Sequence, residues 1–484
     1  MAILKVRDNM IDYRKVCLYT IMFILNCFAC QDATFGAVVA MFEAAYVIFT
    51  AIFGRIGEAL IAHNLCLGFS LEVSLFIFNE SRIMYSYAYW PYIHRWGPLC
   101  VEIGLLLLLV IGYNGRICFF SSYGLKKSWL NRFSASVTSM ICIGCGVSLI
   151  SMLFNDNGIM NFSWYSGTYL TQICYWLILL GNIILIHFFL TKKDGFANQL
   201  RSALVSFFVS MVFSTCITIL LGMSGRYSYH INIVLMPLVV FFGCGLVVFP
   251  FFKNYEHKSL LWYGIIMCVC LVYRMTPLSG KWFLYLLMLG FTLLIVNFTG
   301  KRFVKAILIV LVLGLLCVTI GEKIIASSEL FSYKFEQAMS ILTGAKAIKG
   351  SPLVRLEESA NIAMEYLHKP WCFLFGKGIG GSIKHWLQWT DWSDPNAFVS
   401  AQSSSGVFVS MHESWNVLFL NFGAIGVCFF IEQFITSLKN IRKSPWIILG
   451  ITWFIFFINC YISMYIMISV LMLGMFEVDE QRNN

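Results

Sequence analysis

The chain has 484 residues, of which 59% are hydrophobic and 12% are charged, and its formal net charge is +10. Soluble domains carry about 25% charged residues, so this composition excludes a soluble protein and indicates one that crosses a membrane repeatedly. The apolar runs are also too long for strands of a membrane barrel, which span with about 10 residues.

Taken in chain order, windows of about 20 mostly apolar residues predict roughly 12 to 14 transmembrane helices. The last apolar run is longer than one untilted helix needs, which leaves the count open. We therefore predict an all-α polytopic membrane protein. The predicted spans are residues 16–31, 34–53, 59–78, 97–114, 134–154, 168–190, 202–223, 230–252, 259–275, 282–298, 303–320, 413–436 and 446–474.

Lysine and arginine decide the predicted orientation, because they are enriched in cytoplasmic segments. With the N-terminus inside, most of these residues fall in inside segments, which predicts a cytoplasmic N-terminus. The positive net charge then follows from topology, and no nucleic acid is expected as a partner. The short outside segments carry Arg82, Arg95, Arg226, Arg274 and Lys281.

Two acids, Glu43 and Glu72, lie well inside the second and third predicted spans. An acid there costs about 2.5 to 3.5 kcal/mol on insertion scales, so each needs a partner or a cavity. Local pairing is the favoured interpretation. A proton or ion path, which would suit a transporter, is the alternative.

Most of the 17 cysteines lie within predicted spans. Cys27 and Cys30, like Cys142 and Cys145, have CxxC spacing, but they sit in apolar helices that offer no other metal ligands. We interpret them as small apolar core residues, and we expect neither a metal nor a cofactor.

One long segment, residues 321–411, interrupts the pattern between two spans and lies on the outer face in the predicted orientation. It carries similar numbers of acids and bases, so we expect a folded insert and not a charged tail. The predicted domains are an N-terminal transmembrane bundle (1–320), the large helical loop (321–411) and the C-terminal transmembrane helices (412–484).

The middle of this insert predicts a helix that begins near Ser351 and Pro352 and is ended by Lys369-Pro370. A glycine turn follows, FLFGKGIGG, whose N–H groups and Lys377 could hold phosphate, although it lacks a Walker or dinucleotide pattern. One face of the predicted helix carries Leu353, Leu356, Ala360, Ala363 and Leu367.

The stretch HESWN opens the next predicted span with polar residues. If it is helical from residue 412, His412, Trp415 and Asn416 share a face, whereas Glu413 points elsewhere. Histidine titrates near neutrality, so His412 is a candidate general base for a hydroxyl. A helix cap with ordinary interfacial residues is an equally good interpretation.

Positive side chains on the outer face form a second group of candidates. The positive-inside rule disfavours them there, so they indicate anionic ligands, and pyrophosphate suits guanidinium and ammonium donors. The alternatives are lipid headgroups or pairing with Glu357 and Glu358. These candidates are Arg226, Arg274, Lys281 and Arg355.

Tryptophans gather in the same region. Sugar rings pack well on indoles, so a carbohydrate-binding surface is possible, and an interfacial aromatic belt is the equal alternative. The tryptophans concerned are Trp371, Trp386, Trp389, Trp392 and Trp415.

Three motifs follow one another in the chain: TPLSGKWFLYLL, SPLVRLEESANIAMEYLHKPWCFLFGKGIGG and HESWNVLFLNFGAIG. In this order they resemble the bacterial O-antigen polymerase and O-antigen ligase superfamily. TPLSGKWFLYLL is similar to the family's basic turn before a span, with Lys281 where the family more often has arginine. SPLVRLEESANIAMEYLHKPWCFLFGKGIGG is similar to its arginine-bearing helix and glycine turn. HESWNVLFLNFGAIG is similar to its helix with histidine, asparagine and glycine-x-x-glycine. The likeness covers roughly residues 276–430.

This resemblance implies a GT-C-like helical fold and a metal-independent, inverting glycosyltransferase at the periplasmic face of the bacterial inner membrane. It implies that His412 helps to deprotonate the acceptor, and that Arg274, Lys281 and Arg355 hold pyrophosphate. The expected partners are an undecaprenyl-pyrophosphate-linked oligosaccharide donor and acceptor, membrane lipids and, as a candidate, a chain-length regulator. Further substrate-binding candidates are Arg226, Lys377, Glu413, Trp415 and Asn416.

Among the functions that this implies, an O-antigen polymerase is favoured, because a large, individual insert suits the reading of one particular repeat unit. A ligase that moves the finished glycan to the lipid A core needs the same chemistry. A flippase for the lipid-linked unit, the alternative of another class, would favour internal repeats and short loops, which we do not find.

Overall fold

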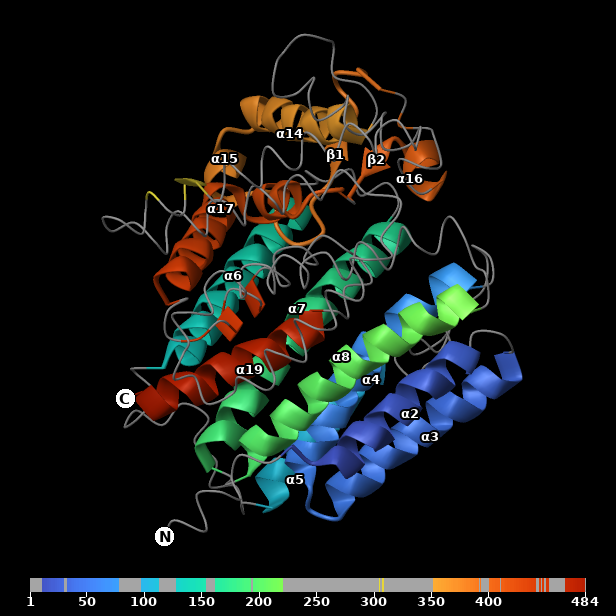
Figure 1. Ribbon diagram of the computed structural model, residues 1–484. Coiled ribbons are helices and arrows are strands. Elements are labelled where there is room, and N and C mark those ends of the chain that lie inside the picture. The colour runs from blue at the N-terminus through green and yellow to red at the C-terminus, as the bar shows by residue number, and fades with distance from the viewer. Residues whose placement is uncertain are drawn as a thin grey trace.

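The computed structural model describes the chain as a mostly helical protein (Figure 1). The described residues are 11–29, 33–77, 97–112, 128–153, 162–192, 195–220, 304, 307–308, 351–390, 392, 400–409, 411–440, 444, 446–447, 450–451 and 466–483. The elements are α2 (Tyr13–Ala29), α3 (Ala33–Ile52), α4 (Ile56–Ile77), α5 (Gly97–Gly112), α6 (Trp129–Leu153), α7 (Phe162–Lys192), α8 (Phe196–Leu220), α14 (Ser351–His368), α15 (Trp371–Phe375), β1 (Ile383–Lys384), α16 (Ser400–Ser405), β2 (Val407–Phe408), α17 (Ser414–Asn440) and α19 (Ile466–Asn483).

Every predicted span up to residue 223, and the one at 413–436, coincides with a helix. Three described stretches are long and apolar enough to cross a membrane: Trp129–Ser151 in α6, Gln172–Leu190 in α7 and Trp415–Asn440 in α17. The helical class is thus confirmed and a membrane protein is compatible with it, whereas the number of spans stays a prediction. Predicted spans 230–252, 259–275 and 282–298, nearly all of 303–320 and most of 446–474 lie outside the described residues.

Helices α2, α3, α4 and α8 pack together, and α7 and α19 join them to α6 (Figure 1). Glu58 ties three of these helices, since it pairs with Lys15 at 2.8 Å and accepts a hydrogen bond from Tyr46 at 2.9 Å. Glu43 is fully buried and its carboxylate interacts with the thiol of Cys66, whereas the side chain of Glu72 lies outside the described residues.

Polar contacts gather both chain ends at one end of the bundle. The N–H of Asp12 donates to Ser202 at the start of α8. Near the end of α19, Glu477 accepts a hydrogen bond from Ser128 and Glu480 accepts one from the N–H of Trp129, so these acids cap the start of α6. The insert lies at the opposite end (Figure 1).

The insert has a small core of its own, which α17 shares. Strands β1 and β2 pair antiparallel, with Ile383 opposite Phe408. Trp392 packs edge-on against Phe408, with ring centroids 4.7 Å apart. Other buried members of this core are Ile362, Tyr366, Cys372, Met411 and Leu420.

Helix α17 bends at Gly423, whose φ of 59° and ψ of −146° are not helical. Because of this bend, Trp415 reaches Phe430, fifteen residues further along, with ring centroids 6.2 Å apart. A straight helix would separate these residues by roughly 22 Å. The segment of α17 before Gly423 therefore runs in a different direction from the segment after it, and it lies under α14 (Figure 1).

Candidate active site

Helix α14 turns its polar residues inward, against the loop at 385–392 and the start of α17. Its predicted apolar face is exposed at Leu356 and Leu367, so this face does not form the core contact. The inner face of α14 instead combines the apolar Ile362 and Tyr366 with carboxylates and amides that bind backbone N–H groups. The buried polar residues of α14 are Glu357, Glu358, Asn361 and Glu365.

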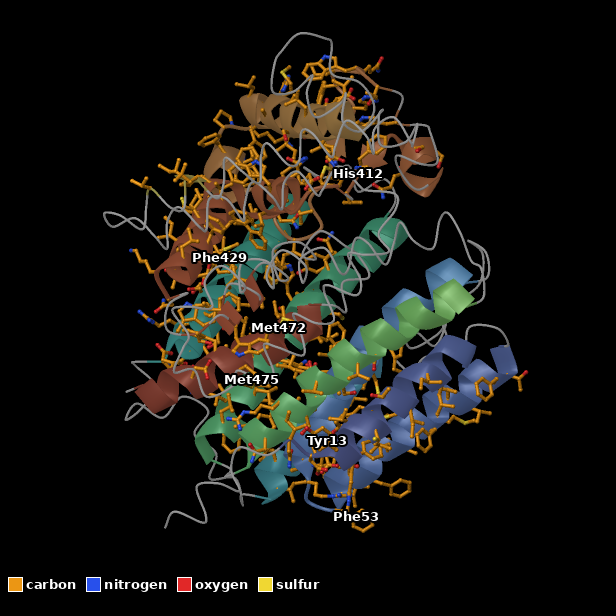
Figure 2. All side chains as sticks on the ribbon, in the orientation of Figure 1. Tyr13, Phe53, His412, Phe429, Met472 and Met475 are labelled. Carbon is orange, nitrogen blue, oxygen red and sulfur yellow. The ribbon has the colours of Figure 1, made fainter. Side chains whose placement is uncertain are left out.

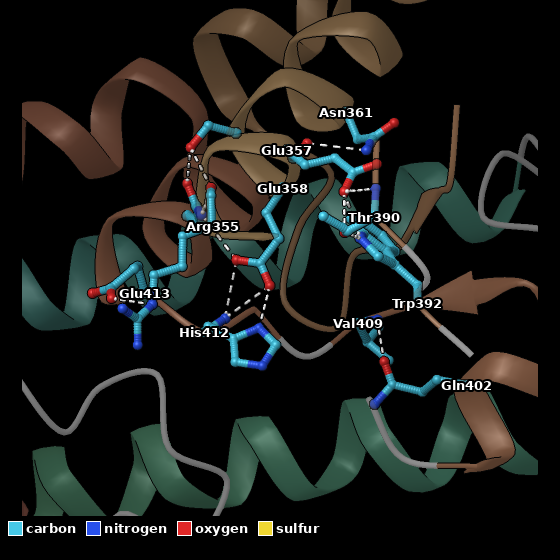
Figure 3. Close-up of polar contacts among 12 residues, drawn as sticks. Arg355, Glu357, Glu358, Asn361, Thr390, Trp392, Gln402, Val409, His412 and Glu413 are labelled. Atoms are coloured by element: carbon cyan, nitrogen blue, oxygen red, sulfur yellow. Dashed lines mark hydrogen bonds and ion pairs between the residues drawn. The ribbon is translucent and has the colours of Figure 1, made fainter. Parts of the chain in front are cut away.

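Glu358 and His412 form the central pair of the site (Figure 3). Nδ1 of His412 lies 2.5 Å from Oε1 of Glu358, and the backbone N–H of His412 donates to both carboxylate oxygens at 3.1 Å. The carboxylate is completely buried, whereas the imidazole is 30% exposed. The pair thus joins a buried carboxylate, which is fixed in place, to an imidazole that a substrate can reach.

Asn416 and Ser359 hold this carboxylate in place. Nδ2 of Asn416 donates to Oε2 of Glu358 at 3.0 Å and to the carbonyl of Arg355 at 3.1 Å. The hydroxyl of Ser359 donates to Oδ1 of Asn416 at 2.6 Å. Every polar atom of the Asn416 amide is therefore engaged, which fixes its direction.

Arg355 and Glu413 form an ion pair beside His412 (Figure 3), with Nε and Oε1 2.7 Å apart. Both side chains are about one-third exposed or more. Such a pair contributes little to stability, roughly 0.2–1 kcal/mol, but it leaves a guanidinium near the imidazole.

Glu357, next to Glu358 on α14, has a structural role in the loop. It accepts hydrogen bonds from the N–H groups of Trp389 and Thr390, the hydroxyl of Thr390 and the indole of Trp392, and it contacts His385 at 2.8 Å. The two neighbouring acids thus serve different purposes, because one organises the loop and the other holds His412.

The glycine turn at 376–381 is bound up within the fold. N–H groups of the turn donate to Leu420 (from Lys377), Asn421 (from Gly378), Gly144 (from Ile379) and Gln172 (from Gly380). Those of Gly376 and Gly381 donate to nearby carbonyls. These N–H groups do not form the phosphate cradle that we predicted, because each already has an acceptor.

Lys377 itself is buried, and its ammonium lies 2.7 Å from Glu365 and donates to the carbonyl of Ser382. Burial lowers the pKa of this ammonium, and the nearby carboxylate opposes that shift only in part. A group so enclosed supports the fold, and its role in binding substrate stays a prediction.

The predicted shared face of HESWN is wrong in part. Helix α17 begins at Ser414, so His412 and Glu413 precede it. His412 and Asn416 nevertheless meet, because both bind Glu358, whereas Trp415 turns to Phe430. Glu413 points elsewhere, as predicted, toward Arg355. Arg226, Arg274 and Lys281 lie outside the described residues.

The five tryptophans do not form one surface. Trp392 is buried and bonded to Glu357. Trp386 and Trp389 are exposed in the loop, and Trp386 stacks on His368 with ring centroids 5.0 Å apart. Trp371 and Trp415 are exposed on α15 and α17. The exposed tryptophans are therefore divided among the loop, α15 and α17.

The sequence reasoning missed the role of Glu358, which it treated as an ion-pair partner for outside cations. The sequence did contain one signal. Glu357 and Glu358 are adjacent on a helix and point in different directions, so both could not pair with Arg355. Spacing alone cannot show that both acids turn inward.

A second histidine–glutamate–asparagine group lies in the helix bundle. His63 of α4 and Glu102 of α5 approach to 3.4 Å, and Asn182 of α7 donates to Glu102 and accepts from Asn64. His63 and Glu102 are 0% and 2% exposed. Gly181 leaves room for the carboxylate, since a Cβ there would lie 2.8 Å from it.

The group formed by His412, Glu358 and Asn416 can carry out acid–base chemistry. When Nδ1–H of His412 donates to Glu358, the neutral ring has its lone pair on Nε2, which can take a proton from a hydroxyl. The carboxylate fixes that tautomer and stabilises the imidazolium that forms.

The chain has no significant match among protein-family models, curated proteins or solved structures.

Proposed function

We propose that this protein is a GT-C-like, inverting glycosyltransferase of the O-antigen polymerase type. It would join undecaprenyl-pyrophosphate-linked repeat units at the periplasmic face of the bacterial inner membrane. The observation that carries the proposal is the pairing of a partly exposed His412 with a buried Glu358. That pairing supports a general base for an acceptor hydroxyl, which is the group that a glycosyltransferase must activate.

In the proposed reaction, His412 takes the proton of an acceptor sugar hydroxyl. The oxygen attacks the anomeric carbon of the donor, the bond from that carbon to pyrophosphate breaks, and undecaprenyl pyrophosphate leaves with the bonding electrons. Direct displacement inverts the anomeric centre. His412 then releases the proton to water.

Arg355 is the described candidate for binding the leaving pyrophosphate, since it lies at the site and its planar guanidinium donates N–H groups that match phosphate oxygens. Its partner Glu413 would have to give way to phosphate, which an exposed pair permits at little cost. Arg274 and Lys281 remain predicted pyrophosphate ligands, and Arg226 remains a predicted substrate ligand.

The placement of the site supports this function. Figure 2 shows His412 beneath α14, at the end of the molecule opposite Tyr13 and Phe53. If the N-terminus is cytoplasmic, as the lysine and arginine pattern predicts, the site faces the periplasm, where the lipid-linked units would be joined.

The test is a gel of surface lipopolysaccharide from a strain that lacks the gene, with wild-type protein or a variant restored. A polymerase predicts core with a single repeat unit in the deletion strain and a ladder on restoration. His412→Ala should lose the ladder, because general base catalysis contributes about 10²- to 10⁴-fold. The matched control is His368→Ala, which changes an exposed histidine of α14 that stacks on Trp386.

Three outcomes would contradict the proposal. A ladder from His412→Ala at wild-type protein levels would remove His412 from the chemistry. Bare core with long lipid-linked glycan outside would indicate a ligase. Bare core with single units on the cytoplasmic face would indicate a flippase.

A further inference from the structure

Apolar side chains cover the outer surface of α15 and the adjoining end of α14. Leu367 and Phe373 are 73% and 59% exposed. Trp371, Leu374 and Phe375 are also exposed, so a helix of five residues carries four large exposed apolar side chains. A surface of this kind marks a contact with another apolar phase.

Hydrogen bonds between the glycine turn, which follows α15, and α6 show how deep the turn lies along the candidate span of α6. Ile379 donates its N–H to the carbonyl of Gly144, and Ser148 donates its hydroxyl to the carbonyl of Ile379. Gly144 and Ser148 lie seven and three residues before the end of the candidate span at Ser151. The turn therefore lies roughly 5 to 10 Å inside that span, at 1.5 Å per residue.

Close backbone contact brings α15 to the same level. A Cβ on Gly423 would lie 2.7 Å from the carbonyl carbon of Leu374, and one on Gly376 would lie 2.4 Å from the nitrogen of Phe422. Phe422 in turn packs on Trp176, four residues into the candidate span of α7. The last turn of α15 thus lies beside the bend of α17, next to the residue that packs on the candidate span of α7.

The backbone at this level is hydrogen-bonded as lipid requires. The carbonyls of Leu420 and Asn421, before the bend, accept the N–H groups of Lys377 and Gly378. The hydroxyl of Tyr366 donates to Leu420 at 3.1 Å. Irregular backbone at membrane depth is tolerated only where protein satisfies it in this way.

Neighbouring helices also expose apolar residues. Leu149 and Ile150 of α6 follow directly on Ser148 and are exposed, and Ile431 and Ile435 are exposed on α17 beyond its bend. The apolar surface of α15 therefore lies beside helix faces that a bilayer would cover.

We infer that α15, with Leu367 of α14, is embedded in the leaflet on the side of the insert and contacts the acyl chains of bilayer phospholipids. Part of the predicted water-facing loop is then a membrane element. Trp371 suits the boundary, where its amphipathic ring lies at headgroup level. This inference does not depend on the proposed function.

Photocrosslinking of the full chain in nanodiscs of phosphatidylethanolamine and phosphatidylglycerol tests this contact. p-Benzoylphenylalanine replaces Phe373 in one variant and Leu374 in a second, and adducts are identified by mass. The control replaces Trp389, which is 49% exposed but lies in the polar loop. We expect about tenfold more phospholipid adduct at 373 and 374 than at 389, since a probe at 389 would meet mostly water.

Equal adduct at all three positions, or none at 373 and 374, would overturn the inference. A second arm adds undecaprenyl phosphate to the nanodiscs. If adducts at 373 and 374 form only with this lipid and carry its mass, the surface is a polyprenyl site and the assignment to bulk phospholipid is wrong.

Discussion

The two histidine–glutamate–asparagine groups contain the same residue types but differ in access and in geometry. His412 lies 2.5 Å from a buried carboxylate and is 30% exposed. His63 lies 3.4 Å from its carboxylate, and both side chains are enclosed by helices. Chemistry on a hydroxyl needs a ring that substrate can reach, so residue composition alone does not identify a site. Burial of the carboxylate together with exposure of the imidazole distinguishes the first group.

The largest effect that tests this difference is expected for Glu358→Gln. Glu358 accepts hydrogen bonds from Nδ1 and the N–H of His412 and from the amide of Asn416. Glutamine would place an NH₂ group against one of these donors, so the imidazole loses its fixed tautomer. We expect polymer formation per folded molecule to fall about 100-fold. The measurement is the rate of polymer formation with purified lipid-linked repeat units.

A double variant sharpens this test. Asn416→Asp in the Glu358→Gln background would offer a carboxylate to the new NH₂ group and retain the acceptor for Ser359. We expect part of the lost rate to return. A double variant no faster than Glu358→Gln alone would show that the carboxylate must stand at residue 358 and not merely nearby.

The next largest effect concerns the buried group of His63, Glu102 and Asn182. Here we expect a loss of folding stability and no loss of activity per folded molecule. Glu102→Ala removes an acceptor from Asn182 in an apolar bundle, which should cost about 1–3 kcal/mol. Less folded protein should reach the membrane, as measured by size-exclusion chromatography of a fluorescent fusion. Polymer formation per folded molecule should stay at the wild-type rate.

Glu102→Gln is the control, because it keeps one carbonyl acceptor for Asn182. If either variant lost activity per molecule as strongly as Glu358→Gln, the two groups would be functionally alike. An active role for the enclosed group would then return weight to transport of the lipid-linked unit.

Much of the fold could be predicted from the sequence, since long apolar runs require helices when no water is present to bind the backbone. The start of α14 followed from Ser351 and Pro352, its end followed from Lys369-Pro370, and the glycine turn appeared where expected. Which face of α14 lies inward could not be predicted. An amphipathic pattern favours apolar residues inward, but here the loop at 385–392 offers N–H groups that only polar side chains can satisfy.

The site was predictable in part for the same reason. His412 and Asn416 were identified from their proximity in the chain, and they do meet. Their meeting point, Glu358, comes from another helix and depends on tertiary packing. The bend at Gly423 was also hidden, because glycine-x-x-glycine suits both a straight close-packed helix and a broken one.

The smallest predicted effect concerns the Glu365–Lys377 pair, which anchors the glycine turn behind the site. Burial alone would raise the pKa of the Glu365 carboxyl, but Lys377, the indole N–H of Trp386 and Lys369 together lower it below its ordinary value of 4.5. A depressed carboxyl pKa stabilises the fold above the ordinary value, and this stabilisation is lost as the pH falls through the lower, folded value. We expect the apparent melting temperature in detergent to drop by about 2–4 °C over that acidic range because of this pair.

The double variant Glu365→Gln/Lys377→Met removes both charges and should lack this part of the pH dependence. Identical acid profiles for the double variant and the wild type would show that this pair does not contribute to the acid stability of the insert. Activity at neutral pH should change less in this variant than in Glu358→Gln, because the pair supports the turn and does not contact His412.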